Sequence, residues 1–365
     1  MAVLLACSPA AFSSDLQING FMNVTAGNLS TNDISLDGYD DGVKFDVGTL
    51  VGLQMSKQVN DSTSATMQLI SRGSEDFNTE ASWAYITYAA NEDTDIRMGR
   101  LRTPFFYYSD FLEVGYAYNW VRPPSVVYRL DAFSSINGVD VTRRFSTSVV
   151  DGSVQVYTGR STNELTTSGD TYVFELRRAL GVVLNLSMGD FGARVSYHQA
   201  DLSADVDPAL AGADGRALDN LAAAAAGFGV GDEFIADEDQ SKFYQASLSY
   251  DNGSTSAIAE WTALDHETAM LNDDTAYLVS VAQRMGDATV HLTYTATEDD
   301  LESGTVGVIQ KNLESKESSI ILGLRYDYDS SAAFKVEVQQ HDEELVQGAK
   351  GDSGLLYNVG MSLVF

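Results

Sequence analysis

The feature that most constrains this chain is an alternation of apolar and polar residues that runs from Leu16 to the last residue. In one clear segment, Leu180, Val182 and Leu184 occupy every second position. A period of two places such side chains on one face of a β-strand and the intervening residues on the other face. About sixteen alternating segments follow one another along the chain. The sequence therefore predicts an all-β fold.

The connections between these segments alternate in length. Every second link is short and rich in turn-forming residues, as near Asn60 and Asp190, and the links between them are usually long, as at residues 28–41, 201–240 and 298–316. An up-and-down barrel with one short-turn rim and one long-loop rim has this asymmetry, whereas a soluble sandwich has no reason to sort its loops. We therefore predict a transmembrane up-and-down antiparallel β-barrel of about sixteen strands.

The polar face of the alternating segments carries long cationic side chains. Such side chains would be costly in a closed apolar core, but they are hydrated in the aqueous lumen of a membrane barrel. A barrel of about sixteen strands is wide enough to enclose an aqueous channel. The cations that fall on this face are Lys44, Arg72, Arg144, Arg177, Arg194, Arg284 and Arg325.

One stretch, from Gly99 to Tyr128, interrupts the series of strands. It is rich in aromatic residues and contains three of the chain's five prolines, Pro104, Pro123 and Pro124. Proline cannot complete the hydrogen-bond ladder of a central strand, and so many aromatic side chains argue against disorder. Long ordered loops usually have a function. We expect an ordered loop that packs against another part of the structure; an apolar excursion over the surface is the alternative.

Composition excludes two classes of protein. No apolar run reaches the roughly 18 residues of a membrane-spanning helix, so a helical membrane protein is excluded. The formal net charge is −30, and no basic patch is present to neutralise phosphates. Nucleic acid is therefore not an expected partner.

The first residues have the character of an export signal. Residues 1–14 are apolar and end in small residues, with Ala11 and Ser13 suited to the positions before a cleavage site. No Lys or Arg precedes this segment, so the true start is expected to lie upstream. Cys7, the only cysteine, lies within it. A lipoprotein signal ending at Cys7 is the alternative.

The end of the chain resembles a known family. Phe365 closes a strand with apolar residues at every second position back to Leu355, including Tyr357. This is similar to the C-terminal strand of Gram-negative outer-membrane barrels, which the barrel-assembly machinery recognises, so Tyr357 and Phe365 are the candidate assembly signal. The stretch from Asp15 to Phe365 resembles the sixteen-stranded general porins. The resemblance implies a single barrel domain in the outer membrane, in contact with lipid and lipopolysaccharide.

The same resemblance implies a function. The general porins are homotrimers that pass small hydrophilic solutes and ions by passive diffusion. We expect the first five strands to form the contact wall of the trimer, with Ala65, Trp83 and Ile86 among their apolar positions.

The motif Gly99-Arg-Leu-Arg-Thr-Pro is similar to the start of the third loop of those porins, which folds into the lumen and narrows it. In that family the loop carries acids, matched here by Asp110 and Glu113, opposite a cluster of cations on the wall. Acids and cations across a narrow gap create a transverse field that favours dipolar, hydrated solutes. Anchoring of the loop is an alternative role for the two acids. The candidates for the cluster are Lys44, Arg72, Arg100, Arg102 and Arg144.

Several alternatives stay open. Residues 116–124 are more aromatic than the resemblance implies, which leaves room for a substrate-selective channel. A surface-binding barrel would use residues 201–240 as its contact surface. No catalytic, metal or cofactor site is predicted, because His198 and His291 have no Ser, Cys or His neighbour at a suitable spacing, although a hydrolase with a distant serine is an alternative. Acid pairs such as Asp273-Asp274 favour a solvated rim over a Ca²⁺ or Mg²⁺ site.

Most of the acids fall in the long loops. Exposed charges are screened beyond roughly 8–10 Å at physiological salt, so the balance at the constriction should matter more than the total charge. The expectation is a modest preference for cations that weakens as the salt concentration rises.

Overall fold

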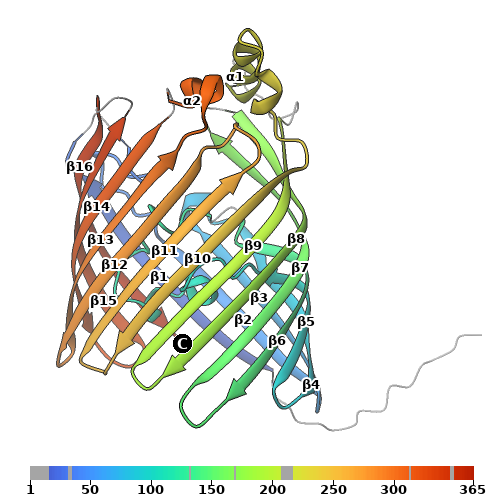
Figure 1. Cartoon of the computed structure of the whole chain (residues 1–365). Helices are drawn as coiled ribbons and strands as arrows, with labels where there is room; N and C mark the ends of the chain where they lie inside the picture. Colours follow the sequence, from blue (N-terminus) through green and yellow to red (C-terminus); the bar gives the residue numbers. More distant parts are fainter. Residues whose placement is uncertain are drawn as a thin grey trace, which may run out of the picture.

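A computed structural model describes residues 16–31, 35–130, 133–167, 170–206, 217–311, 314–345 and 349–365. They form a closed barrel of sixteen antiparallel strands, in which each strand pairs with its neighbours in the chain and the first strand pairs with the last (Figure 1). The prediction of a sixteen-stranded up-and-down barrel is confirmed. The predicted signal segment 1–14 lies outside the described residues.

The strands are between 9 and 19 residues long, and those of the second half of the barrel are on the whole the longer ones. Their bounds are β1 (Gln17–Leu29), β2 (Leu50–Asn60), β3 (Thr63–Arg72), β4 (Thr79–Asn91), β5 (Thr94–Arg102), β6 (Ser135–Ser146), β7 (Asp151–Thr167), β8 (Asp170–Met188), β9 (Phe191–Val206), β10 (Asp239–Asp251), β11 (Thr255–His266), β12 (Asp273–Met285), β13 (Ala288–Asp300), β14 (Ser315–Asp327), β15 (Ala332–Leu345) and β16 (Ala349–Val364).

The two rims of the barrel differ as the link lengths predict. Short turns close one rim, at the bottom of Figure 1, and the opposite rim carries the long loops with the helices α1 (Ala217–Ala226) and α2 (Gly304–Gln310). None of the helices in the described part of the chain has the length and apolarity needed to cross a membrane.

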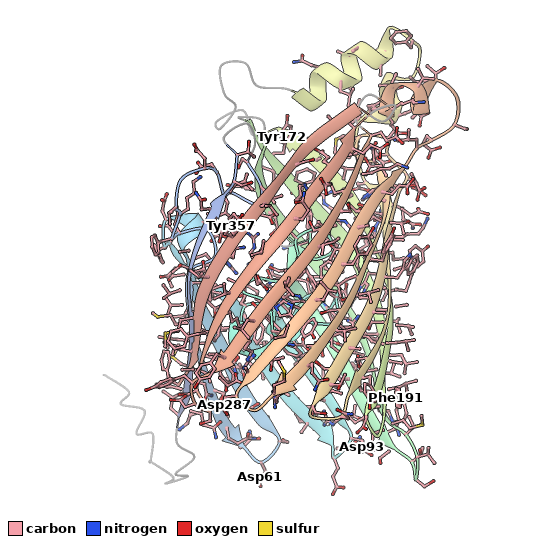
Figure 2. All side chains as sticks on the ribbon, turned by 90° about the vertical axis from the view of Figure 1, so that its left-hand side faces the viewer. Asp61, Asp93, Tyr172, Phe191, Asp287 and Tyr357 are labelled. Atoms are coloured by element: carbon pink, nitrogen blue, oxygen red, sulfur yellow. The ribbon has the colours of Figure 1, made fainter. Side chains whose placement is uncertain are left out.

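The outer wall of the barrel is apolar. Large apolar side chains that stand at every second position of a strand are exposed there, as Val279 and Val281 are on β12, while Leu278 and Ser280 between them are buried on the lumen side. Figure 2 shows that the stick side chains cover the outer wall between the rims, with Phe191 near the short-turn rim. In water such a surface would be unfavourable, and in a bilayer it is the lipid-facing surface of a barrel.

The barrel closes through its last residue. The backbone N–H and C=O of Phe365 bond to Gly20 on β1 at 2.9 and 2.6 Å, which extends the β1–β16 ladder by one pair. The Phe365 ring lies over Gly20, where any Cβ would collide with it. The terminal aromatic residue is thus part of the seam that joins the two ends of the sheet.

Two residues, Lys44 and Trp83, lie elsewhere on the barrel than the sequence predicted. Lys44 was placed on the polar face of a strand, but β2 begins at Leu50, so Lys44 stands in the preceding loop with its backbone paired to Gly27. On β4, Trp83 pairs with Gln68, a buried lumen residue, in the same register as the rest of the strand up to Tyr88. Trp83 therefore shares the lumen side, because it stands three residues from the outward-facing Ile86 and successive side chains of a strand alternate in direction.

We expect Phe365→Ser to reduce assembly of the barrel several-fold, because the change removes the ring that covers Gly20 at the seam. The measurement is the fraction of heat-modifiable barrel in isolated outer membranes. Phe191→Ser is the matched control, since Phe191 is also an exposed aromatic residue but starts a strand far from the seam. Equal effects of the two substitutions would contradict the role of the terminus.

Candidate functional site

The segment between β5 and β6, residues 103–134, is called L3 here, and its described residues, 103–130 and 133–134, lie inside the barrel (Figure 1). They include two short 3₁₀ helices, Ser109–Phe111 and Gly115–Ala117, and much of the rest has irregular backbone. Irregular backbone at membrane depth must find hydrogen-bond partners in the protein or in water, because lipid offers none. The contacts of L3 with the wall supply these partners.

Two cations on the wall bind carbonyl groups of L3. The Lys335 ammonium on β15 donates to the carbonyls of Gly115, Tyr118 and Trp120 at 2.5, 2.8 and 2.5 Å. The Arg325 guanidinium on β14 donates to the carbonyls of Tyr116 and Tyr118 at 2.7 and 2.9 Å. Each cation also lies over a ring of L3, Lys335 4.6 Å from the centre of Tyr118 and Arg325 4.7 Å from that of Tyr116. This is a cation–π arrangement.

A carboxylate on β11 holds a different part of L3. Glu260 accepts from the backbone N–H of Tyr107 at 2.7 Å and from the Tyr128 hydroxyl at 2.6 Å. Gln245 on β10 donates to the same carboxylate at 2.9 Å. Burial, together with the negative charge of Glu260, raises the pKa of the Tyr128 phenol well above its usual value, so Tyr128 stays a hydrogen-bond donor. Arg194 on β9 completes this group by donating to the carbonyls of Pro104 and Phe105.

Aromatic side chains pack L3 against the same part of the wall. Phe105, Phe106, Trp120 and Tyr128 belong to one buried cluster with Phe243 on β10. The Trp120 indole N–H also donates to the Thr293 hydroxyl on β13 at 2.9 Å. The aromatic excess of this segment therefore serves as a core inside the barrel, and the prediction of an ordered loop packed against the wall is confirmed.

The positions of Arg194 and Arg325 were predicted correctly, but their environment was not. Both face the lumen, yet their residues are only 5% and 7% exposed, because L3 covers them. They are paired with backbone carbonyls rather than hydrated. Lys335, 1% exposed, has the same role. The alternation of polar and apolar residues on β15 places Lys335 on the lumen side, but nothing in the sequence indicates its partners.

The structure brings Glu113 together with three of the predicted cations. Glu113 forms ion pairs with Arg72 on β3 and with Arg102 at the end of β5, the latter at 3.6 Å. Arg100 lines the same cavity as Arg72 and Glu113. The backbone carbonyl of Glu113 accepts from the Asn23 amide at 3.1 Å. Glu113 thus anchors the loop and contributes charge to the cavity at the same time.

Asp110 differs from Glu113 in its surroundings. It is exposed, and its carboxylate forms no ion pair among the described residues. It lies close enough to Arg97 on β5 and to Arg194 to interact with their charges. Arg97 was not among the predicted residues; its guanidinium pairs with Asp140 on β6 at 2.7 Å and lies over the Tyr85 ring. The regular alternation of β5 from Ile96 onward was the signal that would have placed Arg97 in the lumen.

Two predicted members of the cluster lie elsewhere. Lys44 pairs with Asp40 at 2.8 Å in the loop before β2 and donates to the Gly38 carbonyl. Arg144 pairs with Asp95 at 2.8 Å next to a short turn. Arg144 lies beside the first residues of β5, and Arg102 ends that strand, so the two are separated by roughly 25 Å at about 3.3 Å per residue. Neither residue belongs to the group around Glu113.

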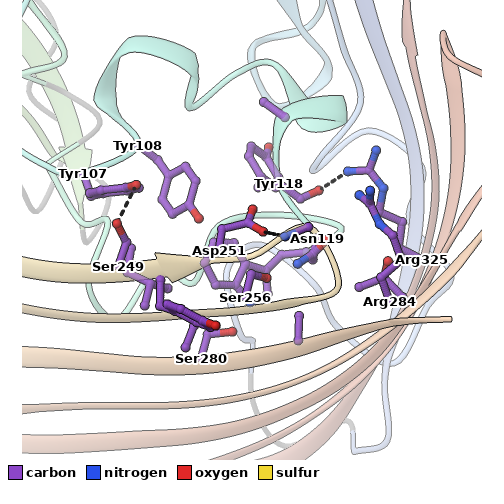
Figure 3. A pocket seen from close by; sticks show the side chains of 18 of the residues that line it. Tyr107, Tyr108, Tyr118, Asn119, Ser249, Asp251, Ser256, Ser280, Arg284 and Arg325 are labelled. Carbon is purple, nitrogen blue, oxygen red and sulfur yellow. Dashed lines mark hydrogen bonds between the residues drawn. The ribbon is translucent and has the colours of Figure 1, made fainter. Parts of the chain in front are cut away.

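L3 has a cavity on each side. The outer cavity, toward the long-loop rim, has a volume of about 740 Å³ and is lined by Arg72, Glu80, Arg100 and Glu113 among others. The inner cavity, toward the short-turn rim, has a volume of about 360 Å³ (Figure 3). In Figure 3, Tyr107, Tyr108 and Tyr118 from L3 face Ser249, Ser256 and Ser280 on the wall, with Arg284 and Arg325 at one side. Both cavities are lined mainly by polar groups.

The histidines on the lumen side are covered. The His198 ring bonds to the Tyr157 hydroxyl at 2.7 Å and to the Ser196 hydroxyl at 2.9 Å, beneath Phe105 of L3. His291 lies 3.3 Å from the Glu337 carboxylate. Within the described residues, no cluster of three or more His, Cys, Asp or Glu side chains is arranged to hold a metal ion.

Comparison with known proteins identifies the family. A family model described as Gram-negative porin matches residues 1–346. The chain belongs to the Gram-negative porin family. It is an outer-membrane porin, a channel for passive diffusion, and the predictions of family, fold, function and location are confirmed. A search of curated proteins finds no relative of this porin.

Solved structures share the fold of this porin at low sequence identity. The outer membrane channel DcaP of Acinetobacter baumannii superposes with a TM-score of 0.64 at 12% identity, over 96% of this chain and 97% of that one. OmpT of Vibrio cholerae, in a form lacking loop L8, gives 0.62 at 12% identity over 96% and 99%. OmpF of Salmonella typhi, in complex with daunomycin, gives 0.58 at 14% identity over 96% and 97%.

We expect Lys335→Met to loosen L3, because it removes one donor from three carbonyls and leaves that of Trp120 without any donor among the described residues. Each unpaired buried group costs about 1–3 kcal/mol. The measurements are the urea midpoint of unfolding, which should fall, and the current noise of single channels, which should rise. Lys242→Met is the matched control, since Lys242 forms a partly exposed pair with Asp265 worth at most about 1 kcal/mol. Wild-type stability and wild-type current noise in Lys335→Met would contradict this role of Lys335.

Proposed function

We propose that solutes pass L3 through the gap between its acidic edge, at Asp110 and Glu113, and the wall formed by β3 to β6. On the other side, Lys335, Arg325 and Glu260 bind L3 to β15, β14 and β11, respectively; these three residues are called the clamp here. The clamp supports the proposed path, because it binds L3 to the side of the wall away from β3 to β6. Asp110 is the observation on which the proposal depends: it is an exposed carboxylate on a loop whose other polar groups are largely paired.

The gap combines both signs of charge. Asp110 and Glu113 stand on the loop, and Arg72, Arg97 and Arg102 stand on the wall. The low-dielectric walls concentrate the field between them. A dipolar solute aligns with this field as it passes, whereas an apolar solute must displace oriented water and gains no interaction. The proposed channel therefore favours small hydrophilic solutes, with a modest preference for cations at low salt.

We expect the double substitution Asp110→Asn with Glu113→Gln to shift ion selectivity toward anions, because it removes two negative charges from the narrow part of the channel. The measurement is the reversal potential across a salt gradient in a planar bilayer. The matched control is Asp232→Asn with Glu233→Gln, which removes two exposed acids from the outer loops. A larger shift in the control than in the double substitution would refute the assignment of the constriction.

We further propose that this porin is a homotrimer. A form of OmpT of Vibrio cholerae that shares this fold is described as a trimer. The contact wall would lie on β2 to β5, where Met67, Ile86 and Met98 are exposed on the outer side. Packing three barrels side by side would bury part of this surface against protein rather than lipid. The barrel-assembly machinery and lipopolysaccharide are the other partners that the family membership supports.

Native mass spectrometry in mild detergent is expected to show three copies of the chain. Ile86→Ser should lower the temperature at which they dissociate, because a hydroxyl replaces an apolar side chain within the proposed contact. Leu322→Ser on β14 is the control, since Leu322 is as exposed on the outer wall but lies far from β2 to β5. Only single chains in the wild-type spectrum would refute the trimer.

A further inference from the structure

The lumen contains a third cavity, and its lining is apolar. This pocket has a volume of about 400 Å³ and lies toward the long-loop rim, beside the outer cavity. L3 contributes Phe105, Leu130 and Phe133 to it. The wall residues that line it and matter most here are Ile136, Phe174, Leu176, Leu202, Phe243 and Leu264.

This part of the lumen departs from the rule for membrane barrels. Lumen-facing positions are normally polar because they meet water. On β9 the lumen side is polar at Arg194, Ser196 and His198, but it continues with Ala200 and Leu202 toward the long-loop rim. L3 covers only part of this apolar surface, so a space of this size remains. An apolar space beside an aqueous channel favours occupation by an apolar group from solution.

Several polar groups at the border of the pocket form ion pairs or hydrogen bonds with one another. Arg129 pairs with Asp274, and the Asn272 amide donates to Asp299 at 2.9 Å. The His266 ring bonds to the Ser241 hydroxyl at 2.8 Å. No charge is therefore offered to a ligand from these pairs. The Thr103 hydroxyl is different: it lines the pocket, its residue is 4% exposed, and it has no hydrogen-bond partner among the described residues.

The arrangement of the rings indicates what fits. Phe133 and Phe174 meet edge to face at 6.1 Å, and Phe105 meets Phe243 in the same way at 5.2 Å. Ring edges and faces presented to one space suit a further flat ring, since aromatic pairs prefer these geometries. Tyr128 of L3 lines the outer cavity, and the next two residues, Arg129 and Leu130, line the pocket, while on β7 Thr162 lines the outer cavity and Ser161 the pocket; the two spaces are therefore neighbours.

We propose that this pocket binds the uncharged aromatic ring of an amphipathic solute, while the hydrophilic part of the solute stays in the outer cavity. The inference rests on the proposed function, because the solute reaches the pocket from the channel. It makes the porin selective for aryl-substituted hydrophilic solutes rather than a size filter alone.

Phenyl β-glucoside is the probe, and methyl β-glucoside is the matched solute that lacks the ring. Isothermal titration of the porin in lipid nanodiscs, with empty nanodiscs as the blank, should show saturable binding of the phenyl compound only. Ala200→Phe fills the pocket from β9 and should weaken this binding about tenfold or more, which corresponds to about 1.4 kcal/mol. Ala259→Phe is the control, because Ala259 is an exposed residue on the outer wall.

Leu264→Ser is a second variant that makes the lining polar without adding volume, and it should also weaken binding. Potassium chloride conductance, measured on the same proteins in planar bilayers, should stay at the wild-type value in both variants, because the pocket lies beside the proposed gap. Equal binding of both glucosides, or unchanged binding in Ala200→Phe and Leu264→Ser, would overturn the proposal. If the wild-type protein shows no potassium chloride conductance, the proposed channel path is refuted instead.

Discussion

The hydrogen-bond requirement of L3 determines how this lumen is organised. The strands satisfy their own backbone groups around the closed barrel, but an irregular loop in the lumen cannot. Lys335, Arg325 and Arg194 donate to its carbonyls, and Glu260 accepts from its N–H and hydroxyl groups. Bonds to charged partners contribute about 1.5–3 kcal/mol each, which offsets the cost of burying these charges.

The clamp divides the lumen into two unequal sides. Beside β9 to β15 the loop and the wall form a continuous core of aromatic rings and paired charges. Beside β3 to β6 some charged side chains stay partly exposed: the side chain of Arg97 is 27% exposed and that of Glu80 is 45% exposed, whereas Arg102 and Asp140 are buried. The path that we propose for solutes lies on this second side, away from the clamp. Its position would then be a consequence of where the loop is anchored.

The fold was predictable because its evidence is local and repeated. Alternation along each strand and the sorting of short and long links both depend on near neighbours in the sequence. Because the pattern is repeated sixteen times, a local error such as the placement of Lys44 on a strand does not change the predicted fold. The β-bulge beside Gln68 was not predictable, because a single extra residue leaves no mark in the pattern.

The site was predictable only in part, because its contacts join residues far apart in the chain. Arg72, Arg102 and Glu113 were identified through the resemblance and do meet. Lys335 and Glu260 were not identified, since their partners lie more than a hundred residues away. A cation on the lumen side of a strand is consistent with either hydration or a buried bond to a loop. Only the path of L3 decides between them, and that path follows from the packing of its rings.

The same division bears on the expected selectivity, because the net charge of −30 is spread unevenly between the outer loops and the lumen. Near the proposed gap the wall cations are matched by acids, with Arg97 held by Asp140 and Arg72 by Glu80 and Glu113. The excess acids, such as Asp232 and Glu233, stand on the outer loops, where salt screens them beyond roughly 8 Å. The loops can enrich cations at the mouth, but a solute inside meets local pairs. In the proposed path, selectivity would therefore depend on shape, on the exposed Asp110 and on the apolar pocket more than on the total charge.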